Sequence, residues 1–230
     1  MLRRTLYICI AVLFAAPVFA DTIAIIGTGN VAKALGPEFA AQGHTIIYGS
    51  RNPGGLKAQD LVKVSGDGAS AVSQQDAVID ADIVVLAVPG MMVAEITKAL
   101  GDLSGKIIID PTNPLERTTL KLQHGVATSN AQIIQDLAPD AYVVKAFNTL
   151  NWKTMIDPEL AGGPVSIPLA GDSSSAKKVV AELVEGMGLE AIDVGGIENA
   201  HWVEGMLMLW INNRISEREA FDIHLRIASQ

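Results

Sequence analysis

Two glycines and an alanine near the start of the chain have the spacing of a phosphate-binding turn. Gly27, Gly29 and Ala32 follow the apolar run 22–26 and lead into helical sequence. The first glycine allows a strand to turn sharply, the second allows a pyrophosphate to approach bare backbone, and the small third residue allows the helix to pack against the strand. The N–H groups at the helix start would face the phosphates. The stretch therefore predicts a dinucleotide-binding turn, although glycines also form turns that bind nothing.

The next strand-like run, 44–49, ends where such folds select their dinucleotide. An NAD-binding protein carries Asp or Glu there, about 20 residues beyond the glycines, to accept a hydrogen bond from the ribose 2′-hydroxyl. This chain has Ser50 and Arg51 instead, with Lys57 nearby. A hydroxyl and a guanidinium can bind a 2′-phosphate through charge-assisted hydrogen bonds. We therefore expect NADP(H) as the cofactor; the alternative is that Arg51 is a solvated loop residue.

The remaining strand ends carry polar side chains without a familiar catalytic set. Segments 87–89, 110–114 and 145–150 hold no Ser-His-Asp combination, no histidine pair at metal-ligand spacing and no close pair of carboxylates. Hydride transfer is compatible with this pattern, because a nicotinamide carries the reactive carbon and the protein mainly positions it. We therefore predict an oxidoreductase with no metal site. Asn148 and His201 are weak catalytic candidates, and the residue that assists proton movement stays open.

Strand-like and helix-like blocks alternate along the chain and would position these ends. This alternation is typical of an α/β protein, with a Rossmann-type doubly wound parallel sheet. We expect an NADP-binding domain over 21–150 and a small C-terminal α/β extension of the same compact unit over 151–230. Strands are expected over 22–26, 44–49, 69–73, 82–89, 106–110, 142–147, 165–171 and 190–194, and helices over 34–42, 74–81, 91–100, 129–137, 173–187 and 197–212.

Residues 1–20 have the pattern of a secretory signal peptide. Arg3 and Arg4 precede an apolar run that ends in small residues at Ala20, which predicts cleavage after that alanine. The twin arginines also resemble a twin-arginine export signal. We therefore expect an exported, periplasmic or secreted protein with no stable membrane span after cleavage. Cys9, the one cysteine, lies in this segment, so the processed chain would lack thiols.

The composition agrees with one acidic globular unit. The chain has 230 residues, 49% of them hydrophobic, which is enough for a full core. Its formal net charge of −8 argues against nucleic acid as a partner.

Taken together, these segments resemble a known family of enzymes. The segments that carry the resemblance include Ile25-Ile-Gly-Thr-Gly-Asn-Val31, Gly49-Ser-Arg51 and Val144-Lys-Ala-Phe-Asn-Thr149, followed by 169–172 and 188–195. Their order and spacing are similar to those of the NADP-dependent oxidoreductases of the deazaflavin coenzyme F-420. That family is related to the cytoplasmic domain of the six-transmembrane epithelial antigen of prostate metalloreductases. The resemblance covers nearly all of the chain beyond residue 20.

The resemblance implies a role for each strand end. The first turn would hold the pyrophosphate, the second strand end the 2′-phosphate, the segment at 88–89 the ribose and nicotinamide side, and the segment at 146–148 the nicotinamide and its acceptor. One position departs from the family: relatives commonly carry Arg-x-x-Glu in the last helix, where this chain has His201 followed by Glu204. The implied cofactor residues, with Gly27 and Lys57 added from the pattern itself, are Gly27, Thr28, Gly29, Asn30, Val31, Ser50, Arg51, Lys57, Val88, Pro89, Ala146 and Asn148.

The last helix has an apolar stripe of Trp202, Met206, Met208 and Trp210. Such a stripe is typical of core or of a dimer face, so a homodimer through the C-terminal helices is one expectation. It could also stack on an isoalloxazine-like ring. His201 could donate a proton to a reduced acceptor, but a packed histidine is the more ordinary interpretation. Asp110 could act as an acid or base, but Asp-Pro-Thr-Asn-Pro first indicates a turn.

The predicted function is hydride transfer between NADPH and a small-molecule redox acceptor, coenzyme F-420 or a flavin. Three alternatives stay open. A reductase of a small imine or keto substrate would need a proton donor near Asn148 and a larger helical domain. An electron-transfer module of a membrane metal reductase would depend on a partner. A non-catalytic NADP(H)-binding sensor would bind the nucleotide without turnover.

Overall fold

The fold is known from a computed structural model. It describes residues 20–116, 118–119, 121–123, 127–163, 165–215 and 225, with the side chains of 210–215 excepted.

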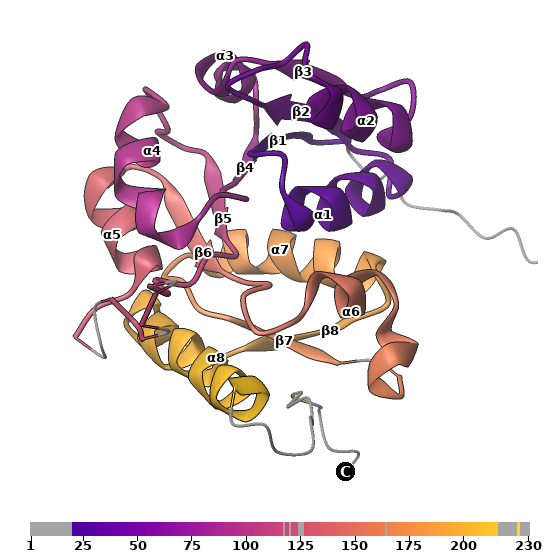
Figure 1. Cartoon of the computed structure of the whole chain (residues 1–230). Coiled ribbons are helices and arrows are strands. Elements are labelled where there is room, and N and C mark those ends of the chain that lie inside the picture. Colours follow the sequence, from indigo (N-terminus) through magenta and orange to yellow (C-terminus); the bar gives the residue numbers. More distant parts are fainter. Residues whose placement is uncertain are drawn as a thin grey trace, which may run out of the picture.

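A six-stranded parallel sheet forms the centre of the molecule (Figure 1). Its strand order is β3-β2-β1-β4-β5-β6, so the chain reverses direction across the sheet between β1 and β4. This confirms the predicted Rossmann-type doubly wound α/β fold. The strands are β1 (Thr22–Ile26), β2 (Thr45–Gly49), β3 (Ser70–Val72), β4 (Ile83–Val85), β5 (Ile107–Asp110) and β6 (Tyr142–Lys145).

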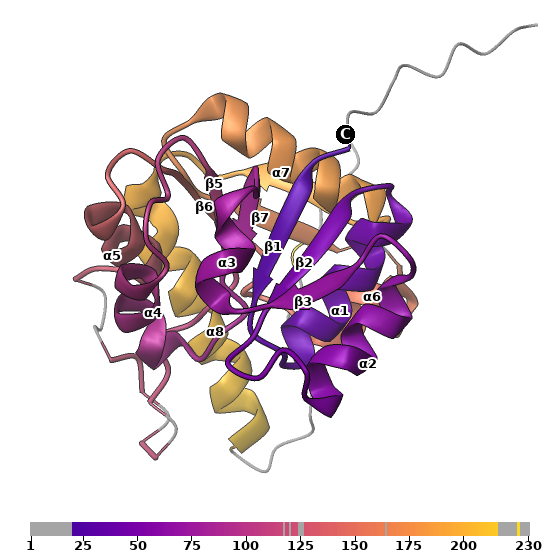
Figure 2. The same ribbon diagram turned by 90° about the horizontal axis from the view of Figure 1, so that it is seen from above.

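Helices cover both faces of the sheet (Figure 2). Alternate residues of β1 point to opposite faces, so Ile23 and Ile25 pack in one core while Ala24 and Ile26 pack in the other. The first face carries α1 (Asn30–Ala41), α2 (Leu56–Ser65), α6 (Trp152–Ile156) and α7 (Ser174–Gly186). The second carries α3 (Gln74–Ile79), α4 (Val93–Ala99), α5 (Asn130–Leu137) and the start of α8 (Ala200–Ile215). Short 3-10 turns are η1 (Gly90–Met92), η2 (Pro158–Ala161) and η3 (Ile197–Asn199).

The C-terminal part adds a second, two-stranded parallel sheet of β7 (Ser166–Leu169) and β8 (Glu190–Asp193). An antiparallel bridge between Lys145 and Ala170 joins it to the edge of β6. Val165 and Ile167 are fully buried in the core that also contains the α1 side chains. The predicted small α/β extension therefore packs against the Rossmann unit.

Some elements differ from the sequence prediction. Helix α1 begins at Asn30, four residues earlier than expected, because Gly29 is its N-cap. Helices α2 and α6 were not predicted, and α2 places Lys57 in its first turn. The run 82–89 forms a strand only over Ile83–Val85, since the chain turns away from the sheet before Pro89.

The predicted signal peptide lies outside the described residues, apart from Ala20. Export therefore stays a prediction, which N-terminal sequencing of the protein purified from its native host tests. A chain that begins at Asp21 is expected, because the small-residue pattern ends at Ala20. A chain that still begins at Met1 would contradict it.

Candidate functional site

The glycine turn follows β1 at the point where the strand order reverses. Gly27 has a φ of 116°, in the region that favours glycine, and its N–H donates to the Gly49 carbonyl at 2.9 Å. A Cβ at Gly27 would lie 2.3 Å from the carbonyl oxygen of Ala87, which follows β4. The loops after β1 and β4 therefore touch at this residue, and ligands of open α/β sheets bind beside such a junction.

The start of α1 is open to an anion. Its N-cap is Gly29, which has no side chain to accept from the first-turn N–H groups, and the first turn contains no acidic residue. Apart from its own chain neighbours and helix backbone, no atom of the described residues lies within 4 Å of the place where a Cβ of Gly29 would stand. Uncapped helix N–H groups and exposed backbone are what a pyrophosphate requires. Asn30 is exposed, and Thr28 and Val31 are half-buried, so the turn fits the predicted group.

Two cations lie beyond β2. Arg51 is exposed directly after the strand, and Lys57 is exposed in the first turn of α2. Across the described part of the chain, neither side chain forms an ion pair. Helix α2 has Gly55 as its N-cap, no side-chain cap and no acid in its first turn, so its positive end adds to the cationic character. The Ser50 hydroxyl accepts from the Asn52 N–H at 3.1 Å, which leaves its proton free to donate. This donor set fits a 2′-phosphate.

The other predicted cofactor residues differ in exposure. Pro89 is exposed and Val88 is half-buried, as expected for residues that border a crevice. Ala146 is fully buried in the core that α1 covers, so its side chain presents no surface. The contacts of these residues with a cofactor stay predictions.

The segment after β6 has an unusual backbone. Phe147 has a φ of 62°, the one positive φ among described non-glycine residues. Such a conformation costs about 1–3 kcal/mol and persists only where surrounding contacts hold it. Here the Phe147 ring is buried and packs edge-to-face on Phe39, with 6.1 Å between ring centroids. The turn directs the Asn148 side chain to Asn113 Oδ1 at 3.0 Å and to the Val203 carbonyl at 3.1 Å.

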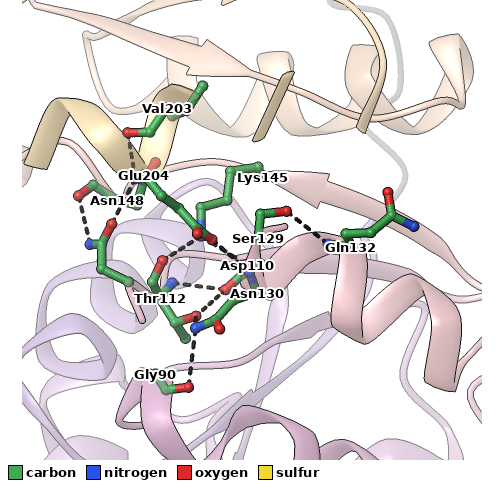
Figure 3. A network of polar contacts seen from close by, with 11 residues as sticks. Gly90, Asp110, Thr112, Ser129, Asn130, Gln132, Lys145, Asn148, Val203 and Glu204 are labelled. Carbon is green, nitrogen blue, oxygen red and sulfur yellow. Dashed lines mark hydrogen bonds and ion pairs between the residues drawn. The ribbon is translucent and has the colours of Figure 1, made fainter. Parts of the chain in front are cut away.

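A buried ionic network lies behind Asn148 (Figure 3). The Lys145 Nζ donates to Asp110 Oδ2 at 2.8 Å, to Glu204 Oε1 at 2.7 Å and to the Thr112 carbonyl. Its three protons are therefore all used. The side chains of Lys145, Asp110 and Glu204 are at most 1% exposed. This network was not predicted from the sequence, and Asp110 is an ion-pair partner rather than simply part of a turn.

The Glu204 carboxylate also caps α5. Its Oε1 accepts from the N–H of Asn130, the first residue of that helix, at 2.9 Å. Burial raises the pKa of Glu204 above the ordinary value of 4.5; the Lys145 ammonium opposes this shift, and the Asp110 carboxylate adds to it.

The raised pKa predicts a pH-dependent stability difference. A carboxyl that holds its proton more tightly in the folded chain contributes stability below its unfolded pKa and loses it as the pH rises through the folded pKa. The free energy of unfolding of the wild type, relative to Glu204→Gln, should therefore fall as the pH rises from about 4.5 towards neutrality. Urea denaturation of both proteins across this range measures it. A difference that does not change with pH would contradict the assignment.

The apolar stripe of α8 is only partly core. Trp202 is 61% exposed and Leu209 is 58% exposed, while Met206 and Met208 are half-buried; the Trp210 side chain lies outside the described residues. His201 is half-buried and its ring lies 4.3 Å from that of Trp202, so it is packed on its neighbour. An acceptor platform and a homodimer face both stay predictions for this helix.

The described residues lack both a metal-binding cluster and a membrane-spanning helix. They contain no group of three or more His, Cys, Asp or Glu side chains that could hold a metal ion. Within the same residues, no helix is both long enough and apolar enough to cross a bilayer.

The fold and the strand-end site define the class of the protein: a Rossmann-type dinucleotide-binding protein with a phosphate turn at its switch point. Within this class, residues 22–114 match the family described as NADP oxidoreductase, coenzyme F420-dependent. The match confirms the predicted enzyme class, an NADP-dependent oxidoreductase.

Two kinds of curated relative are similar to nearly the whole chain. The F420-dependent NADP reductase of Methanothermobacter thermautotrophicus is 29% identical over 85% of this chain and 90% of its own. The metalloreductase STEAP3 of Rattus norvegicus is 30% identical over 83% of this chain. The chain spans only 37% of the length of that metalloreductase.

Solved structures agree with this family. A candidate F420-dependent NADP-reductase from Arthrobacter sp. FB24 superimposes with a TM-score of 0.82, at 29% identity over 91% of this chain and all of the other. A reductive aminase from Aspergillus terreus, solved with NADPH and ethyl-5-oxohexanoate, has a TM-score of 0.64 at 19% identity, over 86% of this chain and 63% of its own. That second likeness shows the shared fold alone.

Proposed function

We propose that the protein transfers hydride between NADPH and a deazaflavin or flavin-type acceptor. The observation that carries the proposal is the cation pair beyond β2 beside an uncapped glycine turn, in a chain that matches 90% of the length of an F420-dependent NADP reductase. Bound NADPH supplies the hydride. The protein's task is then to bind the nucleotide, to hold the acceptor against it and to exclude water.

The described residues divide this task along the carboxyl edge of the sheet. The turn 28–31 would bind the pyrophosphate, and Ser50, Arg51 and Lys57 the 2′-phosphate. Val88 and Pro89 would border the ribose, and Asn148 the nicotinamide side. The described side-chain partners of Asn148 are an amide and a backbone carbonyl, neither of which is an acid. A planar acceptor that takes hydride directly therefore suits this site better than an imine or ketone that needs a protein proton donor.

An acceptor screen tests the proposal. The purified chain without residues 1–20 is mixed with NADPH and, in separate reactions, coenzyme F420, FMN, FAD or a cyclic imine, and the loss of NADPH absorbance is followed. Turnover with a deazaflavin or flavin is expected. Oxidation with the imine alone would contradict the proposal, and binding of NADPH without turnover for any acceptor would favour a sensor.

A second candidate follows from the STEAP3 match, which covers 83% of this chain at 30% identity. The chain could serve as the reductase part of a metal-reducing assembly, passing electrons through a flavin to a separate partner. A ferric chelate added to the same screen distinguishes the two. Ferric reduction that depends on added flavin would favour this candidate.

A further inference from the structure

The buried network connects the carboxyl ends of β5 and β6 with the segment after β4 and with two helices. Asp110 ends β5 and Lys145 ends β6, and their Cα atoms are direct partners in the sheet register. Asn130, at the start of α5, donates through Nδ2 to Thr112 Oγ1 at 2.7 Å and to the Gly90 carbonyl after β4 at 3.1 Å. Glu204 brings in α8. One set of contacts therefore fixes the ends of three strands and two helices (Figure 3).

A second set of hydrogen bonds links the same segments through Asn113 and Asn148. The Asn113 Nδ2 donates to the backbone carbonyl of Asn148 at 3.0 Å. In return, Asn113 Oδ1 accepts from the side-chain Nδ2 of Asn148, also at 3.0 Å. The Asn148 amide also donates to the Val203 carbonyl, one residue before Glu204. The position of Asn148 is therefore set by the placement of α8, and α8 is held at the adjoining residue by Lys145.

The charges of the network indicate a role other than stability. Two carboxylates and one ammonium are buried together, and the N-terminus of α5 supplies the remaining positive potential. Removing such groups from water costs several kcal/mol per ion, and apolar residues of similar volume are often as stable or more so. Asp110 and Lys145 would pair without Glu204. The contribution specific to Glu204 is the fixed placement of α8.

We propose that Lys145 and Glu204 are positioning residues for hydride transfer, an inference that rests on the proposed function. They lock α8 to the ends of β5 and β6 and so fix Asn148 beside the nicotinamide end of the crevice. The dinucleotide phosphates bind at the ends of β1 and β2, on other segments. Loss of the lock therefore lowers kcat and leaves NADPH affinity unchanged.

Glu204→Ala tests this lock, with Glu198→Ala as the matched control. Glu198 is exposed in η3, six residues earlier. Glu204→Ala should lower kcat at least tenfold while the Kd for NADPH stays within twofold of wild type, and amide hydrogen exchange over residues 200–209 should accelerate. Glu204→Gln should restore most of kcat, because its amide oxygen can still accept from Lys145 and from the Asn130 N–H. Glu198→Ala should change none of these quantities.

The pH profile gives a second readout if Glu204→Ala does not fold. The charged groups that face Glu204 are Lys145 and Asp110, so protonation of Glu204 weakens its bond to the Lys145 ammonium. Glu204→Gln carries an uncharged side chain at every pH. Wild-type kcat should therefore decline on the acid side to the value of Glu204→Gln, and Glu204→Gln should lack that decline. Equal losses of kcat in Glu204→Ala and Glu198→Ala, a parallel loss of NADPH affinity, or matching pH profiles would overturn the proposal. If the wild type turns over no flavin-type acceptor, the proposed function fails, and the exchange measurement on the NADPH-bound chain still decides whether Glu204 locks α8.

Discussion

Replacing Gly27 by alanine should abolish NADPH binding and lower the free energy of unfolding by about 2–5 kcal/mol. The new Cβ would stand 2.3 Å from the Ala87 carbonyl oxygen, and the φ of 116° is a conformation that alanine rarely adopts. The Cβ is bonded directly to the Cα of residue 27 and the Ala87 oxygen belongs to backbone, so relief requires the loops after β1 and β4 to separate. That separation displaces the phosphate turn. Urea denaturation and NADPH fluorescence titration measure the two effects.

Gly43→Ala is the matched control for this prediction. Gly43 also has a positive φ, 98°, but in the described part of the chain only its sequence neighbours come within 4 Å of its Cβ position. It should share the backbone cost and not the clash, so it should be more stable than Gly27→Ala by about 1–3 kcal/mol and should bind NADPH normally. Equal stability of the two variants, with NADPH binding retained in both, would show that the two loops do not need this close approach.

Replacing Arg51 by alanine should weaken NADPH binding about 10- to 150-fold and leave NADH binding unchanged. Hydrogen bonds to a charged group contribute about 1.5–3 kcal/mol, which corresponds to that range in Kd. The effect is confined to NADPH, because NADH has no 2′-phosphate for the guanidinium to bind. Isothermal titration with each nucleotide measures the ratio.

Lys63→Ala removes the same charge from the exposed last turn of α2 and should leave both affinities within about twofold of wild type. If Lys63→Ala weakens NADPH as much as Arg51→Ala does, the effect comes from net charge and not from a phosphate contact at Arg51. If Arg51→Ala lowers NADH affinity as much as NADPH affinity, Arg51 does not bind the 2′-phosphate.

Local sequence signals predicted most of the sheet and the phosphate turn. The run 22–26, the glycines after it and the apolar strands each carry their signal within a few residues, so the fold class could be inferred. Helix α2 carried a signal that was missed: Gly54 and Gly55 precede a segment in which Ala58 and Leu61 recur at helical spacing and are buried. Helix α6 has only five residues, too few for periodicity to appear.

The ionic network could be predicted only in part. Asp110 and Lys145 each end an apolar strand, and a charge at that position in a sheet buried on both faces needs a partner. Because Asp110 and Lys145 lie opposite each other in neighbouring strands, they are partners for one another. Glu204 is 59 residues from Lys145 in sequence, and the packing of α8 against α5 places it there, which no local pattern encodes. Phe147, which has the positive φ, likewise packs on Phe39, from a helix early in the chain.

The crystal structure of the chain with NADP⁺ bound tests the central claim most directly. The 2′-phosphate is expected within about 3 Å of the Arg51 guanidinium and the Ser50 hydroxyl, with the pyrophosphate over the backbone of Gly29 at the start of α1. A nucleotide bound elsewhere, or a 2′-phosphate that faces solvent with Arg51 turned away from it, would contradict the account.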